Sequence, residues 1–269
     1  MVILQAIILG IIEGLTEFLP ISSTGHLLVA EKAIGYHDTA RIFTVVVQLG
    51  AIAAVMWYYR KDLLIRISGL FKRQRQDLIF WRNILIATIP AGVIGIAADN
   101  IFNDDMVGVV AAALIIGGLI LLVAEKRLTK QKHTTNVDLD IITAKQAAGV
   151  GCAQVLALVP GVSRSGATIV GGMFAGLNRV SAAAFSFYLS MPIMVLASGY
   201  KLLKGRSNIA DISGGGAALV LATVVAFVTA LIAVSWLLGY ISKNNFKPFA
   251  YYRIIFGLVL IVLLAVGYL

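Results

Sequence analysis

The stretch EGLTEFLPISSTGH, residues 13–26, places two carboxylates, a proline, a Ser-Ser-Thr triplet and a histidine directly after an apolar segment, LQAIILGII. Proline lacks the backbone N–H that a helix needs, and it ends the helix before it. A charged side chain at membrane depth costs at least about 2.5 kcal/mol, so such a cluster marks a functional position more often than a structural one. The stretch therefore predicts a short apolar helix, a polar break with a function, and a second short helix.

The whole chain is apolar enough for a membrane protein. Of its 269 residues, 59% are hydrophobic and 13% are charged, with a mean hydropathy of +0.93. This composition excludes a water-soluble domain and predicts an all-α polytopic integral membrane protein, a single membrane domain over residues 1–269. The N-terminus lacks a basic segment and a small-residue cleavage site, so we expect no cleaved signal peptide. About six full transmembrane helices are expected, over residues 43–59, 83–98, 106–124, 180–200, 214–240 and 254–269.

Charged residues between the spans predict the topology. The net charge is +9, and Lys and Arg concentrate in two predicted loops, residues 60–82 and 125–145, whereas residues 99–105 are acidic. Basic loops of membrane proteins stay in the cytoplasm, so we expect both basic loops inside and the acidic one outside. Such loops contact anionic lipid headgroups. We therefore expect the lipid bilayer, and no nucleic acid, as a partner.

A later segment resembles the first break. EFLPISSTG, residues 17–25, is similar to ALVPGVSRSG, residues 157–166. This weak repeat predicts repeat one over about residues 1–125, repeat two over about 145–269, and a cytoplasmic connecting loop over about 126–144. Each repeat begins with two segments too short to span a bilayer, which is typical of a re-entrant helical hairpin. With the topology above, the halves are inverted and the two breaks meet within the membrane.

Glu13 and Glu17 are four residues apart, so a helix places both carboxylates on one face. Two like charges repel unless a cation or protons lie between them, and Mg²⁺ or Ca²⁺ prefers oxygen ligands of this kind. We therefore expect a divalent cation at this pair. A hydrogen bond between helices, or a proton relay, is the alternative.

The residues after Pro20 are suited to bind an anion. The break frees backbone N–H groups near Ser22, Ser23 and Thr24, and a helix that starts there presents its positive end. His26 lies close enough in sequence to share the site as a base, an acid or a nucleophile toward phosphorus. An ordinary Ser/Thr helix cap is the alternative.

The second break adds a cation. In PGVSRSGAT, residues 160–168, Arg164 stands between two serines with no acidic neighbour. Its planar guanidinium matches phosphate oxygens, and an ion pair with Glu13 or Glu17 across the repeat is the alternative. Together the two breaks predict a site for a phosphate or diphosphate group. Because the chain is membranous, we expect the ligand to be a phospholipid or a polyprenyl phosphate.

The segments EGLTEFLPISSTGH and PGVSRSGATI resemble the signature segments of the undecaprenyl-diphosphate phosphatase family, the bacterial bacitracin-resistance proteins. The resemblance implies a multi-pass enzyme of the bacterial plasma membrane that removes the terminal phosphate of undecaprenyl diphosphate. The product is the carrier lipid for cell-wall synthesis, and the reaction deprives bacitracin of its target. The resemblance also implies an inverted-repeat fold with an active site open to the outer face. A homodimer is one assembly that the sequence allows.

On this resemblance, a cation, Mg²⁺ or Ca²⁺, held by the two glutamates bridges the diphosphate. Ser23 is the expected nucleophile, with His26 or a glutamate taking its proton; His26 itself and a direct water attack are the alternatives. A transporter or flippase of a polyprenyl phosphate lipid is the alternative function. The predicted site comprises the catalytic residues Glu17, Ser23, His26 and Arg164, the metal ligands Glu13 and Glu17, and the substrate-binding residues Ser22, Thr24, Gly25, Ser163, Ser165 and Gly166.

Overall fold

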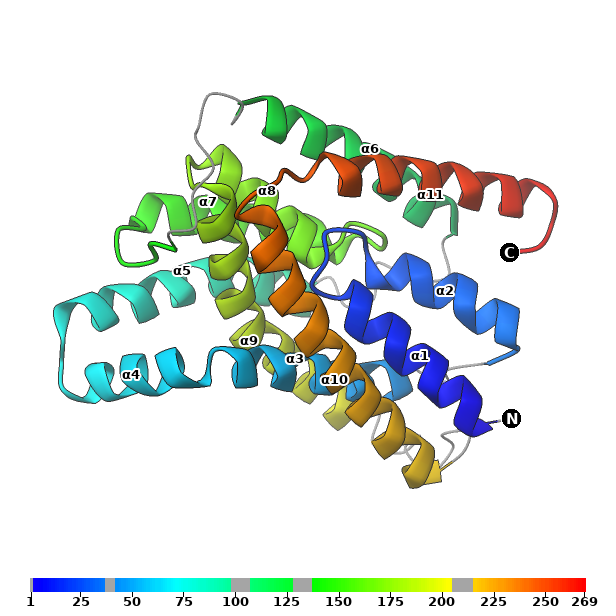
Figure 1. The fold of residues 1–269 in the computed structure, drawn as a ribbon, viewed down its shortest axis with the longest axis horizontal. Coiled ribbons are helices and arrows are strands. Elements are labelled where there is room, and N and C mark those ends of the chain that lie inside the picture. Colours follow the sequence, from blue (N-terminus) through cyan, green and yellow to red (C-terminus); the bar gives the residue numbers. More distant parts are fainter. Residues whose placement is uncertain (1, 37–41, 98–106, 128–136, 205–214) are drawn as a thin grey trace.

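Figure 1 shows the computed structural model of the chain, a bundle in which long and short helices cross one another. The structure describes residues 2–36, 42–97, 107–127, 137–204 and 215–269. Within these ranges every regular element is helical. The elements are α1 (Val2–Thr16), α2 (Ser23–Ile34), α3 (Ile42–Tyr58), α4 (Arg60–Phe71), α5 (Arg75–Ala97), α6 (Val107–Arg127), α7 (Ala144–Val155), a 3₁₀ turn (Leu156–Leu158), α8 (Arg164–Phe174), α9 (Arg179–Lys204), α10 (Gly215–Ile241) and α11 (Lys247–Ala265).

Five of the described helices, α5, α6, α9, α10 and α11, are long and apolar enough to cross a membrane. The pair α3 and α4 passes the same test as a unit, but it is bent by 76° at the break between the two helices. The described residues thus contain up to six candidate spans. The prediction of an all-α polytopic membrane protein is confirmed.

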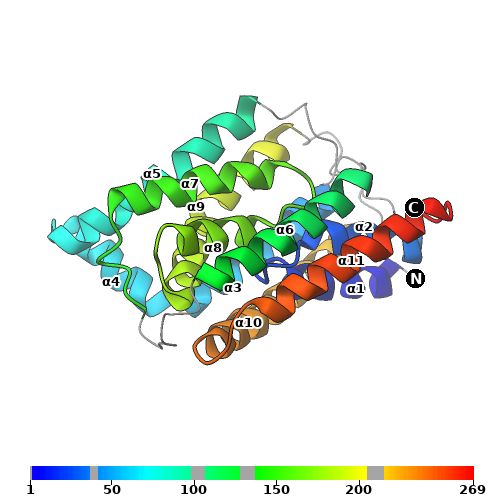
Figure 2. The ribbon, with the colours of Figure 1, turned by 90° about the horizontal axis from the view of Figure 1, so that it is seen from above.

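Helix α9 lies at the centre of the bundle (Figure 1) and packs against α3, α5, α8 and α10. Every side chain from Arg179 to Met191 is buried. This part combines small Ser and Ala side chains with Phe185, Phe187 and Tyr188, and several helices pack against it. Around it, α6 and α11 run side by side, as Figure 2 shows. Helix α9 is therefore a packed support against which α3 and α8 are placed.

The short helices occur in two pairs, α1 with α2 and α7 with α8, and a polar break containing a proline separates the members of each pair. Helix α1 packs along α10, and α7 packs along α5. The first contact is close: a Cβ on Gly10 would lie 2.6 Å from the carbonyl oxygen of Ala222, and one on Gly14 2.5 Å from that of Ala226. Small residues permit this approach, and van der Waals packing then holds helices together in lipid.

Both halves of the chain have the same order of elements. A short helix, a break, a short helix and three longer helices occur twice, with α4 as an extra element in the first half. A repeat would produce this order; its boundaries and the inverted orientation stay predictions. The acidic segment 99–105 and residues 128–136 of the predicted connecting loop lie outside the described residues.

Parts of the two basic segments that were predicted to be loops are helical. Residues 60–82 form α4 and the beginning of α5, because apolar side chains within this segment, such as the buried Leu63, pack inward. Tertiary packing of this kind stabilises helices that are too short to form alone. Glu125, predicted to start the second loop, is buried at the end of α6 and forms an ion pair with Arg179 at 2.6 Å.

Candidate active site

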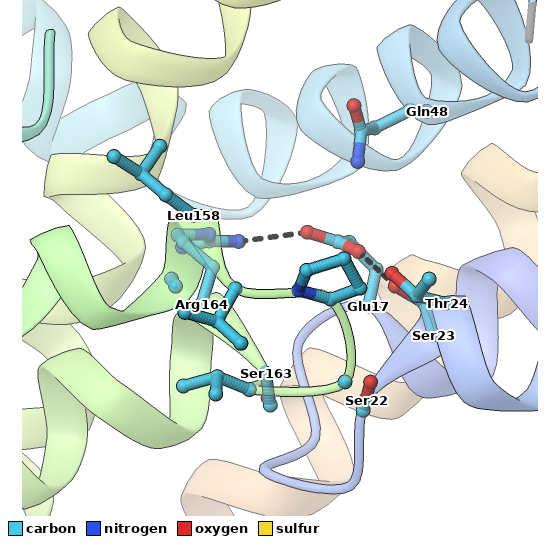
Figure 3. A pocket seen from close by; sticks show the side chains of 13 residues that line it. Glu17, Ser22, Ser23, Thr24, Gln48, Leu158, Ser163 and Arg164 are labelled. Carbon is cyan, nitrogen blue, oxygen red and sulfur yellow. Dashed lines mark hydrogen bonds and ion pairs between the residues drawn. The ribbon is translucent and has the colours of Figure 1, made fainter. Parts of the chain in front are cut away.

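A pocket of about 170 Å³ lies where the two polar breaks meet (Figure 3). Three parts of the chain that are far apart in sequence line it. The first break contributes Glu17 and residues 22–24, the second contributes residues 157–164, and α3 contributes Gln48. The prediction that the two breaks form one site therefore agrees with the geometry of the pocket.

Two helices begin at this pocket. Helix α2 starts at Ser23 and α8 starts at Arg164. The first N–H groups of a helix have no partner within the helix, and the helix dipole makes this end positive. In α8 the Ser163 hydroxyl accepts one of these N–H groups, that of Gly166, at 3.1 Å. In α2 the preceding Ser22 makes no side-chain cap and has a φ of 72°, a backbone conformation that is uncommon outside glycine. The two positive ends together favour an anion.

Glu17 connects the two hairpins. Its Oε2 atom accepts a hydrogen bond from the Ser23 hydroxyl at 2.6 Å, and its Oε1 atom accepts one from Nη2 of Arg164 at 3.2 Å. Figure 3 shows the three side chains in a row across the pocket. A serine whose hydroxyl donates to a carboxylate has a base in position to take its proton. The ion pair that the sequence left open for Arg164 is thus formed with Glu17.

Arg164 keeps unused hydrogen-bonding capacity. Besides Glu17, it donates from Nη1 to the carbonyl oxygen of Ser186 in α9 at 3.3 Å. Its Nε atom is buried and has no hydrogen-bond partner in the described part of the protein. An anion in the pocket would supply an acceptor to this guanidinium, because a buried donor without a partner is costly.

Glu13 lies one helical turn before Glu17 and is 1% exposed. Neither of its carboxylate oxygens has a hydrogen-bond partner among the described residues. Burying an unpaired carboxylate costs several kcal/mol, so this group needs a proton or a cation. A hard divalent cation with Glu13 and Glu17 as ligands fits this requirement. The described residues contain no cluster of three or more His, Cys, Asp or Glu, so the remaining ligands would come from other oxygens.

His26 does not line the pocket. Its Nδ1 atom donates to the carbonyl oxygen of Ser22 at 2.7 Å, and its Nε2 atom is 2.7 Å from the hydroxyl of Tyr252 in α11. Its ring stacks on Phe256, with 4.4 Å between the ring centroids. Aromatic stacking and the tyrosine hydrogen bond hold the imidazole against α11. The prediction that His26 shares the phosphate site therefore differs from the structure, in which Glu17 is the side chain that contacts the Ser23 hydroxyl.

Three of the predicted substrate-binding residues, Ser22, Thr24 and Ser163, line the pocket, and three do not. The Ser165 hydroxyl is fully buried and donates to the carbonyl oxygen of Leu19 at 2.9 Å, which joins the two breaks. Gly25 and Gly166 are packing positions: a Cβ on Gly25 would lie 3.3 Å from Leu114, and one on Gly166 would lie 2.8 Å from Arg253. Ser165 therefore supports the backbone of the first break, and Gly25 and Gly166 permit close packing; the predicted substrate contact is not seen for these three residues.

Gln48 is a pocket residue that the sequence did not reveal. It comes from α3, and in Figure 3 its amide points across the pocket toward Glu17. The available signal was a polar side chain inside the apolar segment FTVVVQLGAIAAV, residues 43–55. A polar amide in an apolar membrane segment is costly, as the two glutamates are, and therefore indicates a functional position.

Arg253 of α11 is a second residue that the sequence did not reveal. It is 2% exposed and forms no ion pair with a described carboxylate; it donates instead to backbone carbonyls. Its acceptors include the carbonyl oxygens of Pro20 at 3.3 Å and Gly161 at 3.4 Å, one in each break, and that of Ala113 in α6 at 3.1 Å. Gly161 has a φ of 88°, and a Cβ there would lie 2.7 Å from the backbone of Val110. Arg253 therefore holds both breaks against α6.

The chain is similar to known proteins over nearly its whole length. A family model described as "Bacitracin resistance protein BacA" matches residues 6–259. A protein of Neisseria gonorrhoeae (strain NCCP11945) named undecaprenyl-diphosphatase is 41% identical over 273 residues, with 100% of this chain and 98% of the relative covered. Relatives with the same name from Bordetella avium (strain 197N) and Nitrosomonas europaea (strain ATCC 19718) are 42% and 44% identical, covering 97% of this chain and 96% and 94% of their own lengths.

Proposed function

The chain belongs to the bacitracin resistance protein BacA family, and we propose that it is a membrane phosphatase that hydrolyses undecaprenyl diphosphate to undecaprenyl phosphate and inorganic phosphate. The observation that carries this proposal is the row of Ser23, Glu17 and Arg164 at the junction of two helix N-termini. The reaction recycles the carrier lipid for cell-wall synthesis and confers bacitracin resistance. We place the enzyme in the bacterial plasma membrane with the pocket open toward the outer side. The basic segment 60–82 supports this orientation, because segments rich in Lys and Arg stay on the cytoplasmic side.

In the proposed first step, Oγ of Ser23 attacks the terminal phosphorus and Glu17 takes the hydroxyl proton. The bond between Oγ and phosphorus forms while the bond to the bridging oxygen breaks. Undecaprenyl phosphate leaves with the electron pair of that bond. Glu17 then releases its proton to solvent. In the second step a water molecule attacks the phosphoserine and gives a proton to Glu17, the bond between Oγ and phosphorus breaks, and Glu17 passes the proton to Oγ, which regenerates Ser23 and releases inorganic phosphate.

The remaining pocket residues stabilise charge. In the proposed complex, the Arg164 guanidinium and the N–H groups at the starts of α2 and α8 would surround the transferred phosphoryl group, because Arg164 and both helix starts line the pocket. Fixed donors and dipoles of this kind are the main source of catalysis in phosphoryl transfer, because they need no reorganisation during the reaction. The Gln48 amide adds a neutral donor from α3.

A divalent cation fits the two glutamates. Glu13, with two unpartnered and buried carboxylate oxygens, and Glu17 would hold it. When bound, Mg²⁺ or Ca²⁺ would neutralise part of the negative charge of the diphosphate. Glu13 is buried, and its carboxylate has no hydrogen-bond partner among the described residues, so the site requires either a cation or a proton there.

Phosphate release in detergent tests the proposed function and separates it from lipid transport. We expect the purified protein to release inorganic phosphate from undecaprenyl diphosphate in Mg²⁺ or Ca²⁺. A chelator should lower the rate at least tenfold, since the diphosphate would then face the Glu17 carboxylate in the pocket without a neutralising cation. Restoring the cation should restore the rate. Absence of release from the wild-type protein in any of these cations would instead favour a transporter, which needs no nucleophile beside a base. Release that is insensitive to the chelator would remove the cation from the proposal.

Replacing Arg253 with methionine should lower kcat about 10- to 100-fold, because both breaks lose their common donor and small misplacements of catalytic groups have effects of this size. Arg253→Lys keeps the charge but can reach fewer carbonyls, so we expect a partial rescue. Initial rates over a range of substrate concentrations separate kcat from KM. The matched control is Arg127→Met, since Arg127 is exposed at the end of α6. A lower unfolding temperature with an unchanged kcat would show that Arg253 only stabilises the fold.

A further inference from the structure

The outer face of α4 is apolar and uncovered. Leu64, Ile65 and Phe71 are 68%, 66% and 82% exposed. With 12 residues the helix is about 18 Å long, too short for the hydrocarbon layer of a bilayer. Its bend of 76° from α3 turns it across the direction of that helix. In Figure 2, α4 and the turn into α5 form the leftmost projection of the molecule.

The inner face of α4 is held in place. Arg66 forms ion pairs with Asp62 at 2.7 Å and with Asp140 at 2.8 Å, and its carbonyl oxygen accepts a hydrogen bond from the Trp81 indole at 3.2 Å. Asp62 also accepts a hydrogen bond from the hydroxyl of Tyr188 in the central helix α9. These contacts fix the rotation of α4 about its own axis. Its apolar outer face therefore stays directed away from the protein.

Positive charge surrounds this apolar face. Five cationic residues at the two ends of α4 have exposed side chains: Arg60, Lys61, Lys72, Arg73 and Arg75. The acidic residues of the same segment, Asp62 and Asp77, lie within 4 Å of Arg66 and so contribute to the inner face. The outer surface thus combines exposed Leu, Ile and Phe side chains with a cationic rim.

We propose that α4 is an interfacial helix that binds anionic phospholipids, with its apolar side chains in the outer part of the acyl layer and its cations on the headgroups. A short helix with an apolar face and a rim of Lys and Arg has the composition of helices that lie in the membrane plane. Charge decides between this occupant and a second copy of the chain. A twofold symmetric contact would place the same five cations against each other, which is repulsive.

Retention of phosphatidylglycerol tests the charge part of this proposal. A quadruple variant should bind phosphatidylglycerol at least tenfold more weakly than the wild type in native mass spectrometry, and its preference for phosphatidylglycerol over phosphatidylcholine should shrink. The four substitutions are Lys61→Gln, Lys72→Gln, Arg73→Gln and Arg75→Gln. The matched control, Arg127→Gln, Lys145→Gln, Lys243→Gln, Lys247→Gln, removes four charges from other exposed positions. It should retain the lipid. Equal losses in both variants would overturn the proposal, since they would reflect overall charge and not α4.

A spin label at residue 71 tests the position of the helix. The variant Phe71→Cys, Cys152→Ala has one cysteine, because Cys152 is the only natural one. In phosphatidylglycerol nanodiscs the label should be more accessible to oxygen than to a water-soluble nickel complex. The reverse order would place α4 in water and overturn the proposal. Short distances between labels of two protein molecules would assign this face to a second copy, with the same consequence.

The proposal is independent of the phosphatase activity. Residues of α4 do not line the pocket, so the variants should release phosphate at the wild-type rate in detergent. Loss of lipid binding with normal phosphate release would support a role of α4 in lipid binding and not in the reaction. Unchanged lipid binding in the variants, with normal phosphate release, would reject α4 as a lipid-binding helix and leave the proposed enzyme function intact.

Discussion

Replacing Ser23 with alanine should lower kcat for phosphate release by about 10³- to 10⁶-fold. Losses of this size are typical when the nucleophile is removed from a set of catalytic residues that act together. The Ser23 hydroxyl is 2.6 Å from the Glu17 carboxylate, and no other pocket residue has a hydroxyl in this contact. Alanine removes the attacking oxygen and leaves Glu17 and Arg164 in place. Initial rates with undecaprenyl diphosphate in detergent measure the effect.

His26 provides the contrast for this prediction. Because its Nε2 atom is bound to Tyr252 and its ring stacks on α11, His26→Ala should lower kcat about tenfold or less, through the position of α2. Rapid quenching of the reaction with labelled substrate should place the label on serine, as an acid-stable and alkali-labile phosphate. Label on histidine, or a Ser23→Ala enzyme with nearly full activity, would contradict the assignment.

Replacing Glu17 with glutamine should lower kcat by about 10²- to 10⁴-fold, the contribution of a positioned general base. Glutamine keeps an oxygen that accepts from Arg164 or Ser23, but it cannot take the serine proton. It also removes the negative charge that pairs with the guanidinium across the two hairpins. Rates and unfolding temperatures of the variant and the wild type measure the two effects separately.

The control for Glu17 is Asp138→Asn, which makes the same chemical change at an exposed carboxylate outside the pocket. It should leave both quantities unchanged. Because the glutamine retains hydrogen-bonding capacity, we expect the activity of Glu17→Gln to fall far more than its stability. A full rate in Glu17→Gln would exclude this carboxylate as the base.

Much of the fold was predictable because the bilayer imposes local rules. A span needs a continuous apolar segment, so hydropathy predicted α5, α6, α9, α10 and α11. Pro20 and Pro160 marked the breaks because proline removes a donor that cannot be replaced locally. The polar breaks were equally visible, since charges in an apolar chain are costly. Helix α4 was missed because its charges suggested a loop, and its stability comes from contacts with α5, α9 and residue 140.

The sequence by itself determined the class of protein, the position of the two breaks and the residue types that are expected at a phosphate site. Only the tertiary structure decided which of them meet. Glu17 and Arg164 are 147 residues apart. Packing of the first hairpin against α10, α3 and α6, and of the second against α9 and α6, brings them to 3.2 Å. The same packing turns His26 toward Tyr252, buries Ser165, and brings Gln48 and Arg253 to the site. The physical reason is that hydropathy and helix breaking depend on neighbours in sequence, whereas a side chain's hydrogen-bond partners depend on which backbones lie beside it in space.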